Sequence, residues 1–156
     1  MSSSFVSSVR AILTIKLGDV VLNRLKVVIA DDNPAVLRQL VVMLGIEFEV
    51  VATAEDGLSA LNQVRQHTPD VVVLDLRMPV LDGNEVARQI RDSGLTSAIV
   101  ICSVETDPGI IQAAQQAGAL GYVFKINMAR DLIPAVRAAA RGATFVSGLD
   151  PLRSAC

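Results

Sequence analysis

Five short apolar runs, spaced almost evenly along the chain, restrict the fold more than any other feature of the sequence. The runs are rich in β-branched residues, begin roughly 22–27 residues apart and alternate with amphipathic stretches of helical period. They are Leu25–Ala30, Phe48–Thr53, Val71–Asp75, Ala98–Cys102 and Leu120–Phe124. Most are apolar throughout instead of alternating, which is typical of strands covered on both faces. The pattern predicts a parallel sheet with helices on both sides.

Capping residues and amphipathic stretches place a helix after each run. The expected helices begin after Asn33, at Gly57, after Asp82, after Asp107 and at Ala129. Two of these caps are followed at once by proline, which favours the first turn of a helix. We therefore expect a flavodoxin-like, doubly wound α/β domain with five parallel strands in the order 2-1-3-4-5 and helices on both faces.

The ends of the chain fall outside this plan. We assign residues 25–141 to the domain, residues 1–24 to an N-terminal extension, and residues 142–156 to a C-terminal tail or the start of a linker. The N-terminal extension is compatible with a hairpin, a packed helix or a loose arm, and the sequence does not choose between them.

Composition excludes several classes of function. Apolar residues make up 51% of the chain, so it folds, while one tyrosine and no tryptophan provide no stacking platform for nucleic acid. A net charge of −2 and the lack of a long apolar run argue against direct nucleic-acid binding and against membrane association. A single histidine and two distant cysteines, Cys102 and Cys156, form no zinc or disulfide pattern, and we expect a cytoplasmic protein.

Polar residues end the predicted strands. Asp31 and Asp32 follow the first run, Asp75 ends the third, Ser103 follows the fourth, and Lys125 follows the fifth. Because the carboxyl ends of parallel strands meet at one edge of a sheet, we expect these side chains to converge there. Three crowded carboxylates require positive charge, and their hard oxygen ligands suit Mg²⁺.

The same edge is suited to holding a phosphoryl group. Lys125 supplies a fixed positive charge and Ser103 a hydrogen bond. An aspartate beside Mg²⁺ can attack phosphorus, and Asp75, at the end of the central strand, is the best-placed nucleophile. The chain would then be its own substrate and not an enzyme that acts on other molecules.

Several separated motifs together resemble the receiver domain of bacterial two-component response regulators. They are Asp31-Asp32 after an apolar strand, the run Val71–Pro79 followed by Asp82-Gly83, Ser103, and the run Gly121–Lys125. The resemblance covers about Leu25–Arg141. The segment Asp131–Phe145 further resembles the last receiver helix of the NarL/FixJ subfamily, in which a helix-turn-helix domain normally follows. We therefore expect a stand-alone receiver or a truncated regulator.

The resemblance implies a role for each acidic residue. Asp75 would accept the phosphoryl group from a sensor histidine kinase or a histidine phosphotransfer protein. Asp32 and Asp75 would bind Mg²⁺, or Mn²⁺, together with the backbone carbonyl of Arg77, and Asp31 would act through water. A homodimer is also compatible with the family.

The resemblance also implies a switch. Ser103 and Tyr122 match the pair in which the hydroxyl moves toward the phosphoryl group and the aromatic ring turns inward behind it. Lys125 matches the lysine that pairs with the phosphate. Three residues depart from the family pattern, Arg77 two positions after Asp75, Val104 after Ser103, and Ile126 after Lys125 where proline is frequent. We expect Arg77 and Val104 to change reaction rates.

Three other readings remain open. The chain is alternatively the receiver fragment of a LuxR-type DNA-binding transcriptional regulator. It is alternatively a phosphorylation-independent interaction module, in which Arg77 permanently replaces the contacts of the phosphate. A metal-dependent phosphohydrolase is the enzymatic alternative, although the sequence shows no second catalytic acid.

Overall fold

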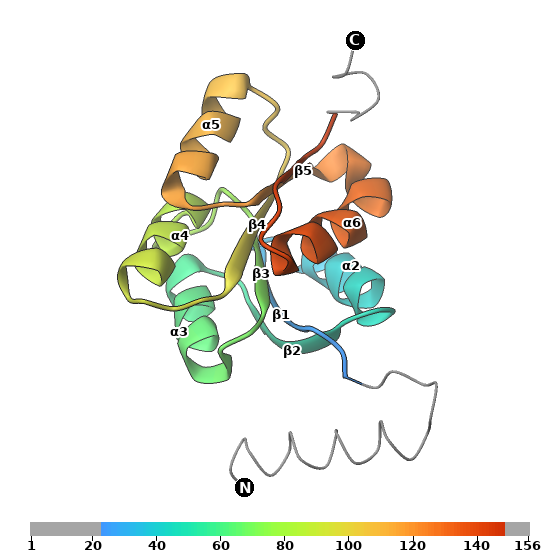
Figure 1. The fold of residues 1–156 in the computed structure, drawn as a ribbon, viewed down its shortest axis with the longest axis vertical. Helices are drawn as coiled ribbons and strands as arrows, with labels where there is room; N and C mark the ends of the chain where they lie inside the picture. The colour runs from blue at the N-terminus through green and yellow to red at the C-terminus, as the bar shows by residue number, and fades with distance from the viewer. Residues whose placement is uncertain (1–22, 149–156) are drawn as a thin grey trace, which may run out of the picture.

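The computed structural model of the chain describes residues 23–148 (Figure 1). The expectations for most of the N-terminal extension and for the last eight residues, 149–156, lie outside the described residues. The strands are β1 (Lys26–Ala30), β2 (Glu49–Ala54), β3 (Val71–Leu74), β4 (Ala98–Ser103), β5 (Gly121–Phe124) and β6 (Phe145–Val146). The helices are α2 (Pro34–Gly45), α3 (Gly57–His67), α4 (Gly83–Asp92), α5 (Pro108–Ala117) and α6 (Met128–Ala140), with a short 3-10 turn, η1 (Lys125–Asn127).

All paired strands run parallel, in the order β2-β1-β3-β4-β5-β6. The flavodoxin-like α/β prediction is confirmed, and the five predicted strands lie in the predicted order. The predicted strand count was wrong, because β6 adds a sixth strand beside β5 in the segment predicted as a tail. Two residues are too few to show a hydrophobic period. The turn at Gly142, with φ of 79°, ends α6 and leads the chain toward this edge.

The sheet lies between two layers of helices (Figure 1). Side chains on one face of β1 and β3, such as Val28 and Val72, belong to the core that α3, α4 and α5 cover. Side chains on the other face, such as Ile29 and Val73, belong to the core that α2 and α6 cover. Because both faces are buried, the strands had to be apolar at consecutive positions.

Three predicted caps, Asn33, Asp82 and Asp107, and one cap that was not predicted, Asp56, start four helices at the carboxyl edge of the sheet. Asn33 accepts hydrogen bonds from the first turn of α2, and Asp56, Asp82 and Asp107 do the same for α3, α4 and α5. The loops after β1 and β4 are short, with three and four residues before the next helix, whereas eight residues separate β3 from α4. Within residues 23–148, no helix has the length and apolar character needed to cross a membrane.

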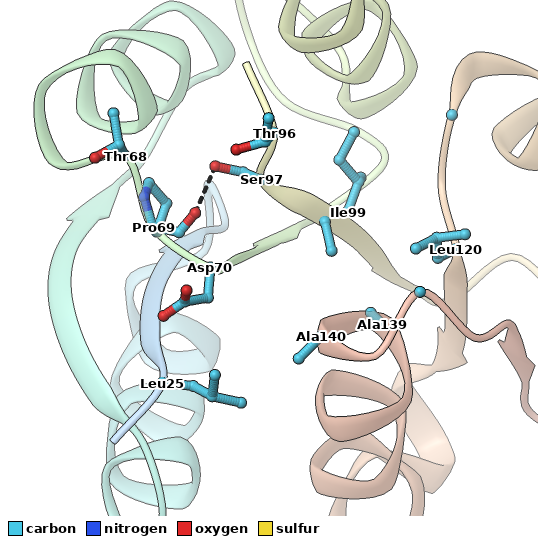
Figure 2. A pocket seen from close by; sticks show the side chains of 13 residues that line it. Leu25, Thr68, Pro69, Asp70, Thr96, Ser97, Ile99, Leu120, Ala139 and Ala140 are labelled. Carbon is cyan, nitrogen blue, oxygen red and sulfur yellow. Dashed lines mark hydrogen bonds between the residues drawn. The ribbon is translucent and has the colours of Figure 1, made fainter. Parts of the chain in front are cut away.

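The opposite edge of the sheet holds a cavity of about 540 Å³ (Figure 2). Its lining includes Asp70 and Ser97, which precede β3 and β4, and Gly118, which ends α5. The Ser97 hydroxyl donates a 2.6 Å hydrogen bond to the Pro69 carbonyl, as Figure 2 shows. The cavity shares no lining residue with the acidic edge described next.

Candidate functional site

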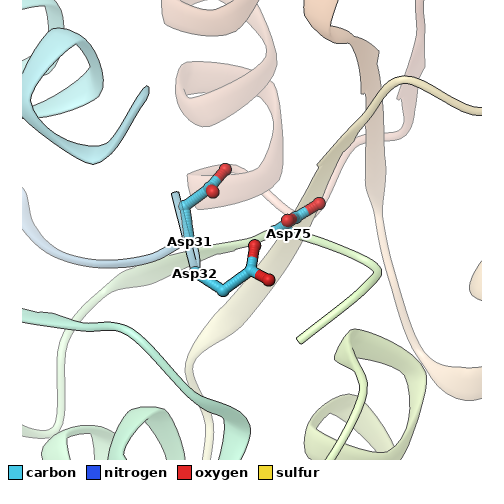
Figure 3. A group of neighbouring side chains, drawn as sticks. All are labelled: Asp31, Asp32 and Asp75. Carbon is cyan, nitrogen blue, oxygen red and sulfur yellow. The ribbon is translucent and has the colours of Figure 1, made fainter. Parts of the chain in front are cut away.

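Three carboxylates meet where β1 and β3 end (Figure 3). One ligand atom from each of Asp31, Asp32 and Asp75 lies within 4.8 Å of the others. The backbone fixes this meeting, because the Asp31 N–H donates to the Ala54 carbonyl at 3.1 Å and the Asp75 N–H to the Ala30 carbonyl at 2.9 Å. Asp31 is fully buried and Asp75 is 7% exposed, whereas Asp32 is open to solvent.

Lys125 brings the positive charge to this edge from the end of β5. Its Nζ lies 2.8 Å from Asp31 Oδ2 and 3.4 Å from Asp75 Oδ1. Burial lowers the pKa of Lys125, but the two carboxylates outweigh it and the net pKa is raised. The ammonium is therefore a permanent charge here. Residues separated by 94 positions in the chain, 31 and 125, thus form one ion-pair cluster at the predicted edge.

The Asp75 carboxyl group has a clearly raised pKa. Burial and repulsion from Asp31 raise its pKa to about 6, although Lys125 pulls in the opposite direction. One lysine does not balance three carboxylates, and the cluster favours further positive charge. The donor set consists of hard oxygen atoms, which fits a divalent cation such as Mg²⁺. That the Arg77 carbonyl is a further ligand stays a prediction.

Ser103 and Tyr122 lie beside the acidic edge, on β4 and β5. The Ser103 hydroxyl is buried and accepts the Glu105 N–H at 3.1 Å. Tyr122 is only 1% exposed, and its hydroxyl donates a 2.8 Å hydrogen bond to the Glu105 carbonyl. The Tyr122 ring also packs edge-on against Phe124, with ring centroids 6.0 Å apart. The aromatic ring is therefore turned inward.

Two of the three residues that depart from the family pattern, Arg77 and Val104, lie on the loops of this edge. The guanidinium of Arg77 lies 3.6 Å from the carboxylate of Glu105, and Val104 between Ser103 and Glu105 is 72% exposed. No sequence motif indicated Glu105, because its main chain makes the contacts with Ser103 and Tyr122. Any side chain would have allowed those contacts, so residue type was uninformative.

Gly83 permits the close approach of α4 to the site. Its N–H donates to the Leu76 carbonyl at 2.8 Å, and a Cβ at this position would lie 2.5 Å from the Asp75 carbonyl oxygen. The Asp82-Gly83 pair therefore both caps α4 and lets the helix approach the main chain of Asp75 closely. A larger residue would displace the strand end that carries this carboxylate.

Comparison with known proteins identifies the family. Residues 27–137 match the response regulator receiver domain. The chain is 34% identical over 126 residues to the transcriptional regulatory protein NarL of Mycobacterium tuberculosis, covering 80% of this chain and 58% of NarL. The solved receiver domain of that protein superposes with a TM-score of 0.75 at 34% identity, covering 77% of this chain and 98% of that one.

A second solved structure is the isolated receiver domain of RcsB from Salmonella enterica, determined with the phosphomimetic BeF3⁻. It superposes with a TM-score of 0.73 at 27% identity and covers 81% of this chain and 95% of that one. The chain thus spans somewhat more than half the length of the curated relative NarL and nearly all of these isolated domains. It belongs to the receiver-domain family of the response regulators, and its relatives are of the NarL type.

Proposed function

We propose that the chain is a phosphorylatable signalling switch, in which Asp75 accepts a phosphoryl group from a sensor histidine kinase or a histidine phosphotransfer protein. One observation carries the proposal. A buried carboxylate ends the central strand with an ammonium 3.4 Å away and two further carboxylates within 4.8 Å. This grouping joins a nucleophile to the charges that transfer of an anionic group requires.

In the proposed reaction an Asp75 carboxylate oxygen forms the new bond to phosphorus. The bond from phosphorus to the imidazole nitrogen of the donor breaks, its electron pair stays on the imidazole, and that ring takes up a proton from solvent. The Lys125 ammonium, whose Nζ lies 3.4 Å from Asp75 Oδ1, would form an ion pair with the incoming phosphoryl oxygens. Asp31, Asp32 and Asp75 would hold Mg²⁺ or Mn²⁺, which neutralises charge on the phosphoryl group when bound.

The outcome of the reaction is a change of shape and not a released product. Ser103 would turn its hydroxyl toward the phosphoryl group, and Tyr122 would be held inward behind it. The chain would catalyse only its own phosphorylation and dephosphorylation. The solved relative RcsB, whose receiver domain was studied with a phosphate mimic, supports this reading.

Intact-mass spectrometry after incubation with acetyl phosphate and Mg²⁺ tests the proposal. The wild type should gain one phosphoryl mass, and Asp75→Asn should gain none. Asp82→Asn is the matched control, because it removes an acid that caps α4 while keeping a good capping residue, and it should be modified like the wild type. A wild type that stays unmodified, or an Asp75→Asn variant modified to the same extent, would refute the proposal.

A second candidate function is favoured by the relatives themselves. NarL is a transcriptional regulatory protein, and this chain matches 58% of its length. The corresponding proposal is that the receiver controls a DNA-binding output domain. Sequencing the coding region beyond the codon for Cys156 tests it, because a helix-turn-helix in the same frame supports the proposal and a stop codon excludes it.

A further inference from the structure

Glu105 connects three parts of the acidic edge that no single motif joins. Its N–H donates to Ser103 Oγ at 3.1 Å, and its carbonyl accepts the Tyr122 hydroxyl at 2.8 Å. Its carboxylate lies 3.6 Å from the guanidinium of Arg77. The main chain of Glu105 thus holds the switch pair, while its side chain reaches the loop that follows Asp75.

The ion pair between Arg77 and Glu105 joins two neighbouring loops. Arg77 follows Asp75 by two residues on the loop after β3, and Glu105 follows Ser103 by two residues on the loop after β4. β3 and β4 are neighbours in the sheet, so the ion pair ties together two adjacent loops at the rim of the site. Movement of the second loop away from the first would break the pair and shift the main chain of Glu105.

Tyr122 depends on that main chain. A buried tyrosine hydroxyl needs a hydrogen-bond partner, and a ring whose partner leaves is favoured to turn toward water. The Tyr122 hydroxyl donates to the Glu105 carbonyl and also interacts with the Ser103 hydroxyl, which the Glu105 N–H holds, and the ring is 1% exposed. The orientation of the Tyr122 ring therefore depends on the position of the loop after β4, which the ion pair between Arg77 and Glu105 holds.

We propose that the ion pair between Arg77 and Glu105 is a clasp that biases Tyr122 toward its inward orientation, which makes both residues positioning residues for the switch. The proposal rests on the proposed function only in naming Ser103 and Tyr122 as the switch. The pair is half exposed, at 65% for the Arg77 side chain and 35% for the Glu105 side chain. Exposed pairs are weak, so the clasp should change the ratio of inward to outward rings by roughly two- to five-fold.

The composition of the chain allows the orientation of the Tyr122 ring to be measured directly. Tyr122 is the single tyrosine, and the chain has no tryptophan. Fluorotyrosine labelling therefore gives one ¹⁹F resonance that reports this ring alone, and acrylamide quenching of tyrosine emission gives an independent measure of its exposure. Both are recorded in EDTA without a phosphodonor, so a failure of Asp75 phosphorylation and a failure of the clasp are separate results.

A charge-swap series tests the clasp. Arg77→Glu and Glu105→Arg should each lower the inward-to-outward ratio of Tyr122 two- to five-fold, and the double variant, which restores an opposite-charge pair, should recover most of the wild-type ratio. High salt should move the wild type toward the single variants. Arg88→Glu is the matched control, because it removes another exposed arginine–glutamate pair, with Glu85 on α4, and should leave the ring unchanged.

Two outcomes would overturn the clasp. The first is a Tyr122 signal that is the same in the wild type and in both single variants. The second is a shift in the single variants that the double variant fails to reverse, because the loop would then respond to each side chain and not to the pair. The milder variants Arg77→Gln and Glu105→Gln repeat the test if a charge reversal prevents folding.

Discussion

Among single residues, Asp75 is a carboxylate buried at the carboxyl edge of the sheet, and its negative charge costs stability. Its pKa of about 6 lies above the ordinary value of 3.8, so the folded chain binds the proton more tightly than the unfolded chain. Its favourable contribution is complete below pH 3.8 and is lost as the pH rises through about 6. Above that pH the ionised group opposes folding.

Asp75→Asn should therefore stabilise the protein at pH 7.5, by on the order of 1–3 kcal/mol in EDTA. The gain should shrink as the pH is lowered from 6 toward 4, because the wild-type carboxyl then becomes neutral as well. Urea unfolding at a series of pH values measures this. Asp107→Asn, which keeps the cap of α5, should show no such gain. A gain that grows toward low pH would contradict the assignment.

Val80 is the second residue whose chemistry conflicts with its position. It has φ of 72°, a region that β-branched side chains rarely adopt, and its side chain is 72% exposed. Burial therefore offsets little of the backbone strain. Strain of this kind costs about 1–3 kcal/mol, and glycine removes it at the expense of entropy in the unfolded chain.

Val80→Gly should raise the free energy of unfolding by about 1 kcal/mol. Val104→Gly serves as the control, because Val104 is equally exposed and has no positive φ. That variant should lose roughly 0.5 kcal/mol instead. Equal effects of the two substitutions in thermal or urea unfolding would show that the backbone at Val80 is not strained.

At the scale of elements, β6 is attached to the domain by a buried polar network. The Ser147 hydroxyl donates to Asp131 Oδ2 on α6 at 2.7 Å and accepts the Phe124 N–H at 3.0 Å. The Ser147 N–H also donates to the Tyr122 carbonyl at 2.9 Å. Both Ser147 and Asp131 are buried, so one hydroxyl joins α6 and β6 to the strand that carries the proposed switch.

Ser147→Ala should destabilise the protein by about 1–3 kcal/mol, because it leaves the partly buried Phe124 N–H without its acceptor and the buried Asp131 carboxylate with one partner fewer. Hydrogen exchange should accelerate first at two amides. The Phe145 N–H donates to the carbonyl of Leu120, just before β5, and the Ser147 N–H donates to the carbonyl of Tyr122 on β5. Thr144→Ala, at an exposed neighbouring position, should change neither measurement. Unchanged exchange at β6 in Ser147→Ala would show that the network does not hold the strand.

Across the whole molecule, the features that could be predicted from the sequence are those to which many residues contribute. Continuous apolar runs gave β1 to β5, and caps such as Asn33 and Asp82 gave helix starts within a residue or two. The polar residues that end the strands indicated the cluster of Asp31, Asp75 and Lys125, because parallel strands share one carboxyl edge.

The features that sequence did not predict depend on few residues or on the main chain. β6 has two residues and no period of its own, and its attachment needs Ser147 to meet Asp131 across the fold. Glu105 contributes backbone groups that every residue has, and the positive φ of Val80 contradicts the preference of valine. Such features depend on contacts between distant parts of the chain, and no local sequence pattern indicates them.

The proposed switch requires that Asp75 is the residue that becomes phosphorylated. Borohydride reduction of the phosphorylated chain converts an aspartyl phosphate to homoserine, and tandem mass spectrometry of the digest then locates the converted residue. We expect conversion at position 75 alone, dependent on the phosphodonor and on Mg²⁺. Conversion at Asp31 or Asp32, or a phosphoryl group recovered on Ser103, would contradict it.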